Sequence, residues 1–294
     1  MVESTVNVVT TIRPGDVPVP AEYAALGAKS GYAPCPADEL RMLIDGPEGE
    51  GKTTFAASVP DNIILDFERG ADGIVAPRSV RIHIKGYDHY VHVTDKLLAD
   101  AKAGKRPFSR ITFDTTDRWV TMIATQIAHE KMVEDIVEYG QEGHGWQLLR
   151  NRCWSKVQEL EEAGYAWTMV GHLTEKTVTD PVTKKDITVP RLSVFPTLKN
   201  PLVQSVEFHG TVFCITTEEP DMETVKLPSG QSISRPKAAN KKITTYYFDC
   251  SSTLGKQGKK RGVPTMKARI ELPLVNGWDV FIEEYRKAIR KEQK

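Results

Sequence analysis

The chain has 294 residues, and its 39 lysines and arginines balance 39 aspartates and glutamates, so the formal net charge is zero. This length suffices for one large α/β core with an added small subdomain, and the zero net charge excludes nucleic-acid binding through overall charge, leaving only a local basic patch. The four cysteines lie far apart, without zinc-ligand spacing, and no leader pattern or apolar run of about 18 residues occurs. We therefore expect a cytoplasmic protein without disulfides or a membrane partner.

The first 38 residues are rich in proline, and only residues 6–12 have the character of a strand. We interpret residues 1–38 as an N-terminal arm or linker and residues 39–294 as one domain. A β-prone segment ahead of a proline-rich linker either adds to the sheet edge of a neighbouring subunit or forms a disordered leader. The sequence leaves both alternatives open.

A phosphate-binding loop pattern, G-x-x-x-x-G-K-[ST], lies near the start of the domain. Its residues are Gly46, Pro47, Glu48, Gly49, Glu50, Gly51, Lys52, Thr53 and Thr54. An apolar strand at 41–45 precedes it, and a helix beginning at Lys52 or Thr53 follows. The glycines let backbone N–H groups point at a phosphate, Lys52 would reach the β- and γ-phosphates, and the Thr53 hydroxyl would bind Mg²⁺. The pattern predicts a nucleotide site.

Two apolar runs that follow predict buried strands ending in carboxylates. Residues 62–67 form the first, which ends at Asp66-Phe67-Glu68, and residues 110–117 form the second, in which Asp114 closes the apolar run. Ligands bind beyond the carboxyl ends of parallel strands. We therefore expect Asp114 beside the phosphate loop, holding Mg²⁺ through water in the Walker B arrangement.

Helices and strands alternate through this part of the chain. The sequence predicts a strand at 79–84, a helix over 90–101, a helix over 119–127, a mobile loop at 139–145, a helix over 146–160 and a strand at 166–170 that ends at His172. This order predicts an α/β fold with a mostly parallel sheet and helices on both faces.

Beyond His172 the chain becomes β-rich. Residues 174–190 predict a hairpin or an extended loop, and residues 218–242, rich in Pro, Ser, Lys and Glu, predict a mobile insertion. The other expected elements are strands at 211–215, 243–249 and 266–272, a basic turn at 256–262 and a terminal helix over 278–291. Lys267 and Arg269 alternate along the last strand and are expected on one side of it.

With these residues in place, the chain resembles RecA-like ATPases, and most closely the single-domain RecA-like proteins that bacteriophages encode for DNA recombination and single-strand annealing. The resemblance covers about residues 40–285. It implies a RecA-like core that binds ATP and Mg²⁺, with Glu68 as the catalytic glutamate, Asp114 supporting the metal, and His172 in the polar position that couples the γ-phosphate to a DNA-binding loop.

The same resemblance implies partners and further site residues. Single-stranded DNA would contact two loops, and the candidate residues are Tyr139, His144, Lys176, Lys184, Lys185 and Arg191. The protein would form a homo-oligomer, a ring or a filament, in which Lys267 and Arg269 reach the neighbouring subunit's γ-phosphate, and a single-strand-binding protein is an expected partner. We expect the chain to depart from the family in two ways, because the sequence indicates no separate N- or C-terminal DNA-binding domain and its second loop is acidic as well as basic.

Two other functions fit the same motifs. One is a small-molecule kinase of the phosphate-loop class, although the sequence shows no arginine-rich lid between Asp114 and His172. The other is a binding module in which the nucleotide stabilises a DNA-binding or partner-binding conformation without turnover.

Overall fold

The computed structural model describes residues 18–28, 34–70, 73–74, 78–139, 143–179, 186–194, 196–226, 232–252, 258–273 and 275–292. The expected strand at 6–12 and the lysines Lys184 and Lys185 lie outside these residues. None of the helices in this described part of the chain combines the length and the apolar character needed to cross a membrane.

One sheet organises the molecule, with the strand order β3-β2-β4-β5-β1-β7-β8-β10. Its strands are β1 (Met42–Gly46), β2 (Asn62–Asp66), β3 (Ser79–His83), β4 (Arg110–Asp114), β5 (Ala166–Thr179), β7 (Phe208–Lys226), β8 (Ser232–Asp249) and β10 (Arg269–Leu272), while β6 (Asp186–Leu192) pairs with β5 and β9 (Lys259–Lys260) with β7. Along this order, each pair of neighbouring strands from β3 to β7 is parallel. The pairs β7–β8 and β8–β10 are antiparallel. The predicted α/β class with a mostly parallel sheet and a β-rich C-terminal part is confirmed.

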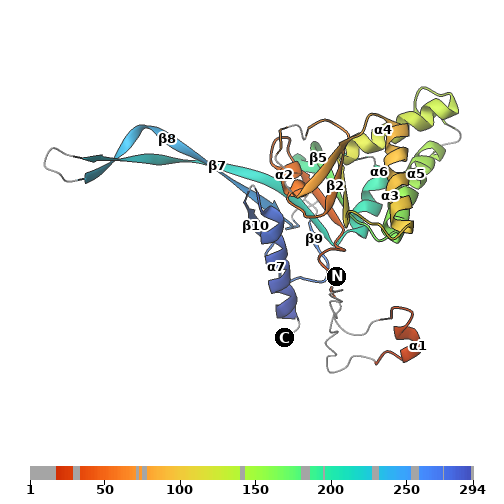
Figure 1. Ribbon diagram of the computed structural model, residues 1–294. Coiled ribbons are helices and arrows are strands. Elements are labelled where there is room, and N and C mark those ends of the chain that lie inside the picture. The colour runs from red at the N-terminus through yellow and green to blue at the C-terminus, as the bar shows by residue number, and fades with distance from the viewer. Residues whose placement is uncertain are drawn as a thin grey trace.

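Helices cover both faces of this sheet (Figure 1). They are α2 (Lys52–Ala57), α3 (Tyr87–Lys102), α4 (Thr116–Lys131), α5 (His144–Glu162), α6 (Pro196–Ser205) and α7 (Gly277–Glu292), with a short α1 (Ala21–Ala24) and the 3-10 turn η1 (Ile136–Glu138). Successive residues of a strand face opposite sides. Leu43 of β1 accordingly packs in the core under α3, α4, α5 and α6, whereas Met42 and Ile44 pack in the core under α2 and α7.

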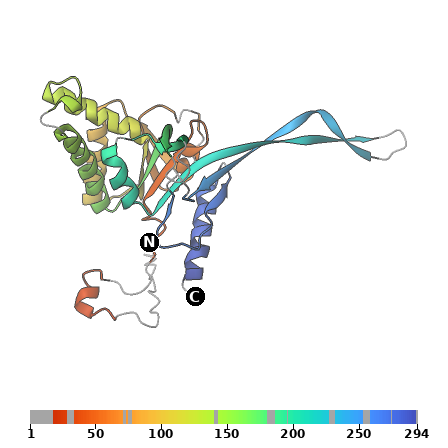
Figure 2. The same ribbon diagram turned by 180° about the vertical axis from the view of Figure 1, so that it is seen from behind.

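A two-stranded ribbon formed by β7 and β8 projects far beyond the rest of the sheet (Figures 1 and 2). Its pairing runs from Thr211 opposite Asp249 to Lys226 opposite Ser232, with a register shift between Pro220 and Met222. Residues 218–226 and 232–242, expected within an insertion, are therefore strand. Glu218 lies opposite Lys242 in this ribbon, and such cross-strand pairs of opposite charge stabilise a sheet. The composition of the segment, taken alone, does not indicate strands.

The structure also corrects several predicted boundaries. Residues 174–179 and 186–190 pair as the two arms of the predicted hairpin, because β5 pairs with β6 from Leu173 opposite Leu192 to Thr179 opposite Asp186. The basic turn expected at 256–262 contains strand β9, and β10 begins at Arg269 instead of at Met266. Lys267 consequently precedes the strand, and the argument that it shares a side with Arg269 by strand alternation was wrong.

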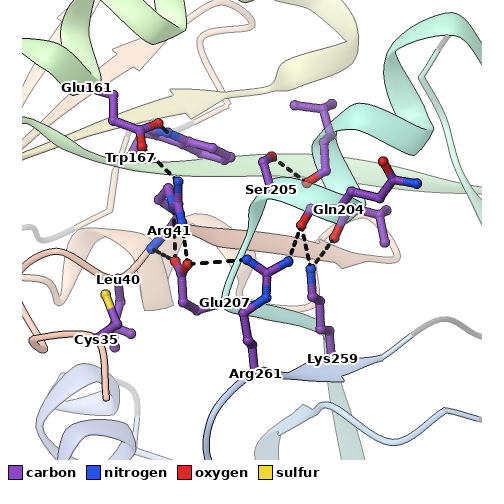
Figure 3. A network of polar contacts seen from close by, with 12 residues as sticks. Cys35, Leu40, Arg41, Glu161, Trp167, Gln204, Ser205, Glu207, Lys259 and Arg261 are labelled. Atoms are coloured by element: carbon purple, nitrogen blue, oxygen red, sulfur yellow. Dashed lines mark hydrogen bonds and ion pairs between the residues drawn. The ribbon is translucent and has the colours of Figure 1, made fainter. Parts of the chain in front are cut away.

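A polar network ties the sheet together at the edge where β1, β5 and β7 begin (Figure 3). Arg41 donates to the buried Glu207 from its backbone N at 2.8 Å and from Nε at 3.1 Å, and its Nη1 lies 2.7 Å from Oε1 of Glu161 at the end of α5. Trp167 of β5 donates to the other oxygen of Glu161 at 3.1 Å, and Arg261 lies 3.9 Å from Glu207. This network holds the edge of the sheet opposite the carboxyl ends of the strands.

Replacing Glu207 by Ala should lower the free energy of unfolding by about 3 kcal/mol, because Arg41 would lose its principal partner in a largely buried place. This expected loss of stability lies at the lower end of the range for breaking a buried ion pair, because 27% of the Arg41 side chain is exposed. Urea denaturation measures the change, and the exposed Glu162→Ala serves as the control, with an expected loss below about 0.5 kcal/mol. A loss from Glu207→Ala no larger than that of the control would contradict the structural role.

Candidate nucleotide-binding site

The phosphate loop joins β1 to α2, as the sequence predicts, and its backbone explains the glycines. Gly51 precedes α2 with φ at +88°, a conformation that favours glycine. A Cβ atom at Gly46 would lie 2.2 Å from the carbonyl oxygen of Val212, so β7 passes too close for any side chain there. The loop therefore depends on glycine both for its turn and for its contact with β7.

A pocket of about 380 Å³ lies above the loop at the carboxyl edge of the sheet. Its lining consists of Glu48, Gly49, Glu50, Gly51, Lys52, Thr53, Thr54, Asp66, Glu68, Gly70, Ile74, Asp114, Thr115, His172 and Tyr246. The structure thus brings together the predicted loop residues 48–54 with Glu68, Asp114 and His172.

Strand register explains why these side chains converge. Asp66 lies opposite Asp114 in the β2–β4 pair, and Gly46 lies opposite His172 in the β1–β5 pair, so the strands end at the same level. Asp66 then shapes the turn after β2, because its Oδ1 accepts hydrogen bonds from the backbone N–H groups of Glu68 at 3.0 Å and Arg69 at 2.7 Å. Asp66 therefore positions Glu68 at the pocket.

Two buried charged groups of the pocket, Lys52 and Asp114, are suited to ligands of opposite charge. Burial lowers the pKa of Lys52, which is 5% exposed, although the carboxylates of Asp114, Glu48 and Glu68 oppose this shift. Its Nζ donates to the carbonyl oxygen of Pro47 at 2.5 Å. Phosphate oxygens in the pocket would be the natural partners of this ammonium group.

Asp114 provides the complementary feature. Burial raises the pKa of its carboxyl to about 6, opposed by a hydrogen bond from Thr53, and its Oδ1 has no hydrogen-bond partner among the described residues. A buried oxygen without a partner beside a threonine hydroxyl suits Mg²⁺, which takes oxygen ligands. Thr53 and Asp114 would hold the ion, and protonation of Asp114 should weaken its binding below about pH 6.

Beside the loop, Glu68 belongs to a network of four ionisable side chains, whose other members are Arg118, Asp117 and His172. The Nε atom of Arg118 lies 2.9 Å from Oε1 of Glu68. His172 lies between the carboxylates of Asp117 and Glu68, with its Nδ1 3.3 Å from Asp117 and its Nε2 3.9 Å from Glu68. The hydrogen bond with Asp117 raises the pKa of His172. Burial alone would raise the pKa of Asp117, but the hydrogen bond and charge of His172 outweigh it and lower that pKa.

Sequence reasoning missed Asp117 and Arg118, although a signal was present. Both follow Asp114 within four residues, at the start of the helix after a strand that ends in the site. Residues placed there must lie near the carboxyl edge of the sheet, so their charge was a usable indication.

Sequence reasoning also missed the contribution of the ribbon. Tyr246 of β8 lies against the loop, since a Cβ at Gly51 would meet its ring at 2.9 Å, and the backbone N–H of Cys214 in β7 donates to the Glu50 carboxylate. The base of the ribbon thus contacts the phosphate loop directly. No local pattern could reveal this contact between residues so far apart in sequence.

The residues predicted to contact DNA lie in two separate places. Lys176 and Arg191 belong to the β5–β6 hairpin, opposite Val189 and Thr174 respectively, next to His172. The α4–α5 connection lies at the end of the domain remote from the ribbon (Figures 1 and 2), with the Tyr139 ring 5.1 Å from Lys131 Nζ and an exposed His144.

The loop expected at 139–145 is shorter than predicted, because α5 begins at His144 and includes Gly145. A Cβ at Gly145 would lie 1.8 Å from the carbonyl oxygen of Ile136. Glycine is therefore required there for close packing of η1 against the helix, not for flexibility.

Lys267 and Arg269 lie outside the nucleotide pocket of their own chain. Lys267 Nζ is 3.4 Å from Glu284 of α7, and Arg269 Nη2 is 3.2 Å from Asp249, with its guanidinium 5.2 Å from the Phe213 ring. Each cation thus has an acidic partner within the chain, which relieves the mutual repulsion expected of two neighbouring cations.

The structure combines three features: a glycine-containing loop with a buried lysine, a buried aspartate suited to Mg²⁺, and a mostly parallel sheet that carries both. These features define a P-loop NTPase. The chain belongs to the AAA domain family, whose sequence model matches residues 38–206. No match was found among curated proteins.

Proposed function

We propose that this AAA-type P-loop NTPase is an ATPase that acts on single-stranded DNA in phage recombination or replication, as an annealing or recombinase-type protein. The observation that carries the proposal is the position of His172. It lines the nucleotide pocket, contacts the network of Glu68, and is followed directly by the hairpin that bears Lys176 and Arg191. Strand β5 therefore runs from the nucleotide pocket directly into a hairpin whose sequence carries cations.

In the proposed reaction, each pocket residue has a distinct task. Lys52 stabilises charge on the β- and γ-phosphates, and Thr53 and Asp114 hold Mg²⁺, which neutralises phosphate charge when bound. Glu68 orients the attacking water or accepts its proton. His172 reports the presence of the γ-phosphate to the hairpin.

On the DNA side, the hairpin cations would contact phosphates, with Lys176, Lys184, Lys185 and Arg191 as candidates. Tyr139 and His144 would stack on bases at a second contact. In a homo-oligomer, Lys267 and Arg269 would exchange their acidic partners for the neighbour's nucleotide, and a single-strand-binding protein would present the DNA. These assignments extend the resemblance to phage RecA-like proteins and are part of the proposal.

Phosphate release with and without single-stranded DNA tests this function. We expect ATP hydrolysis that single-stranded DNA stimulates, with an affinity for DNA that falls as salt rises. Turnover that requires an added small-molecule acceptor would indicate a kinase instead. Nucleotide binding without any release would indicate a binding module, and in either case the proposed function is wrong.

A further inference from the structure

The wall of a second pocket of about 370 Å³ includes Asp117 and Arg118, two members of the Glu68 network. The remaining lining consists of Val120 and Thr121 of α4, Thr174 of β5, Leu192 of β6 and the following Ser193 and Val194. This pocket therefore lies where the first turn of α4 meets the base of the β5–β6 hairpin. It shares its wall with the Glu68 network of the nucleotide pocket.

Arg118 lines the second pocket and forms an ion pair with Glu68, which lines the nucleotide pocket. Its side chain is 65% exposed, and among the described residues Glu68 is its only hydrogen-bonding partner, through Nε at 2.9 Å. A guanidinium has five N–H donors in a planar fork that matches phosphate as well as carboxylate. Most of the donors of Arg118 thus remain open to a second anion.

The charges around Arg118 favour such an exchange. Asp117, the other acidic residue of this wall, is hydrogen-bonded to His172, and this contact raises the pKa of His172. The backbone N–H of Ser193 donates to the carbonyl oxygen of His172 at 2.8 Å, so a ligand at Ser193 would also lie against the strand end that carries His172. An ion pair whose arginine is exposed, such as Arg118–Glu68, contributes little to stability, so a competing phosphate can break it.

We propose that Arg118 is a movable cation that binds Glu68 when DNA is absent and binds a phosphate of the single-stranded DNA backbone when DNA occupies the second pocket. This inference rests on the proposed function and adds the residue that couples the two sites. While Arg118 holds Oε1, Glu68 has one oxygen fewer for the attacking water. Transfer of Arg118 to the DNA frees that oxygen, so DNA binding raises the rate of hydrolysis.

The test compares wild type with Arg118→Gln, Arg118→Lys and the control Arg150→Gln, which removes an exposed arginine of α5. Arg118→Gln should raise DNA-free hydrolysis about fivefold, the factor that corresponds to an exposed ion pair, and should lower the further stimulation by DNA accordingly. In DNA binding, the slope of log affinity against log salt should flatten by about 0.7, the loss of one phosphate contact. Arg118→Lys should retain part of both effects, and the control should match wild type.

Each other result contradicts the proposal. DNA-free hydrolysis that stays constant or falls in Arg118→Gln, while wild type remains DNA-stimulated, overturns the role of Arg118 and leaves the proposed function intact. An unchanged salt slope shows that Arg118 does not contact DNA. A wild-type protein that neither binds nor responds to single-stranded DNA overturns both proposals, and stimulation of wild type by millimolar sulfate to the same rate as DNA would assign the pocket to a free anion.

Discussion

Lys52→Ala should bind nucleotide about ten- to a hundredfold more weakly, the cost of one charge-assisted hydrogen-bonding partner, and should lose turnover by about 10² to 10³ on top of this. Lys52 is the cation of the phosphate loop and lies buried among Glu48, Glu68 and Asp114. Without it, the backbone N–H groups of the loop and the metal would have to offset the phosphate charge beside these carboxylates. Calorimetric titration of nucleotide and a phosphate-release assay measure the two effects.

The same substitution should not unfold the protein, which separates a functional role from a structural one. Burial lowers the pKa of Lys52, so the fold gains nothing from charging this group, and its described hydrogen bond goes to the Pro47 carbonyl oxygen. The melting temperature should therefore stay within a few degrees of wild type. Lys105→Ala, an exposed lysine after α3, is the matched control and should retain both binding and turnover. Normal turnover in Lys52→Ala would rule out the loop as the catalytic phosphate site.

Glu68→Gln is expected to keep nucleotide binding and to lose hydrolysis by about 10² to 10⁴, the usual contribution of an acid–base group. Glutamine preserves the shape of the side chain and can still accept a hydrogen bond from Arg118, but it cannot take a proton from water. The turn that presents residue 68 depends on Asp66, so the backbone should not change. Single-turnover hydrolysis with saturating nucleotide isolates the chemical step.

Glu162→Gln provides the matched control for this experiment, since Glu162 is an exposed carboxylate at the end of α5. It should hydrolyse ATP at the wild-type rate. If Glu68→Gln did the same, Glu68 would be only a strand-end carboxylate paired with Arg118, and the search for the base would move to Asp117.

Much of the parallel core was predictable from local sequence. Buried parallel strands are apolar on both faces, so the runs that became β1, β2 and β4 stand out against the polar helices between them. Such strands also deliver their last residues to one edge. Asp114 could be chosen for this reason, and the resemblance to RecA-like ATPases then singled out Glu68 and His172.

The antiparallel part of the fold resisted the same reasoning. Residues 218–242 contain Pro, Ser and charged residues, which locally favour turns, and their strand structure arises from cross-strand partners far along the chain. Helix α6 was not predicted either, and Gly145 was taken for a flexible loop residue because its packing partner Ile136 cannot be recognised from spacing.

By itself the sequence determined the phosphate loop, the mostly parallel character of the sheet around it and the strand tips that face it, because these follow from short apolar runs and from glycines with local backbone roles. Only the tertiary structure decided that Arg118 binds Glu68, that Asp117 binds His172, and that Tyr246 and Cys214 bring the ribbon onto the loop. Those contacts join residues from different strands and helices. Their partners are set by how the sheet orders its strands and by which side chains burial forces together, and neither is encoded in any single stretch of the chain.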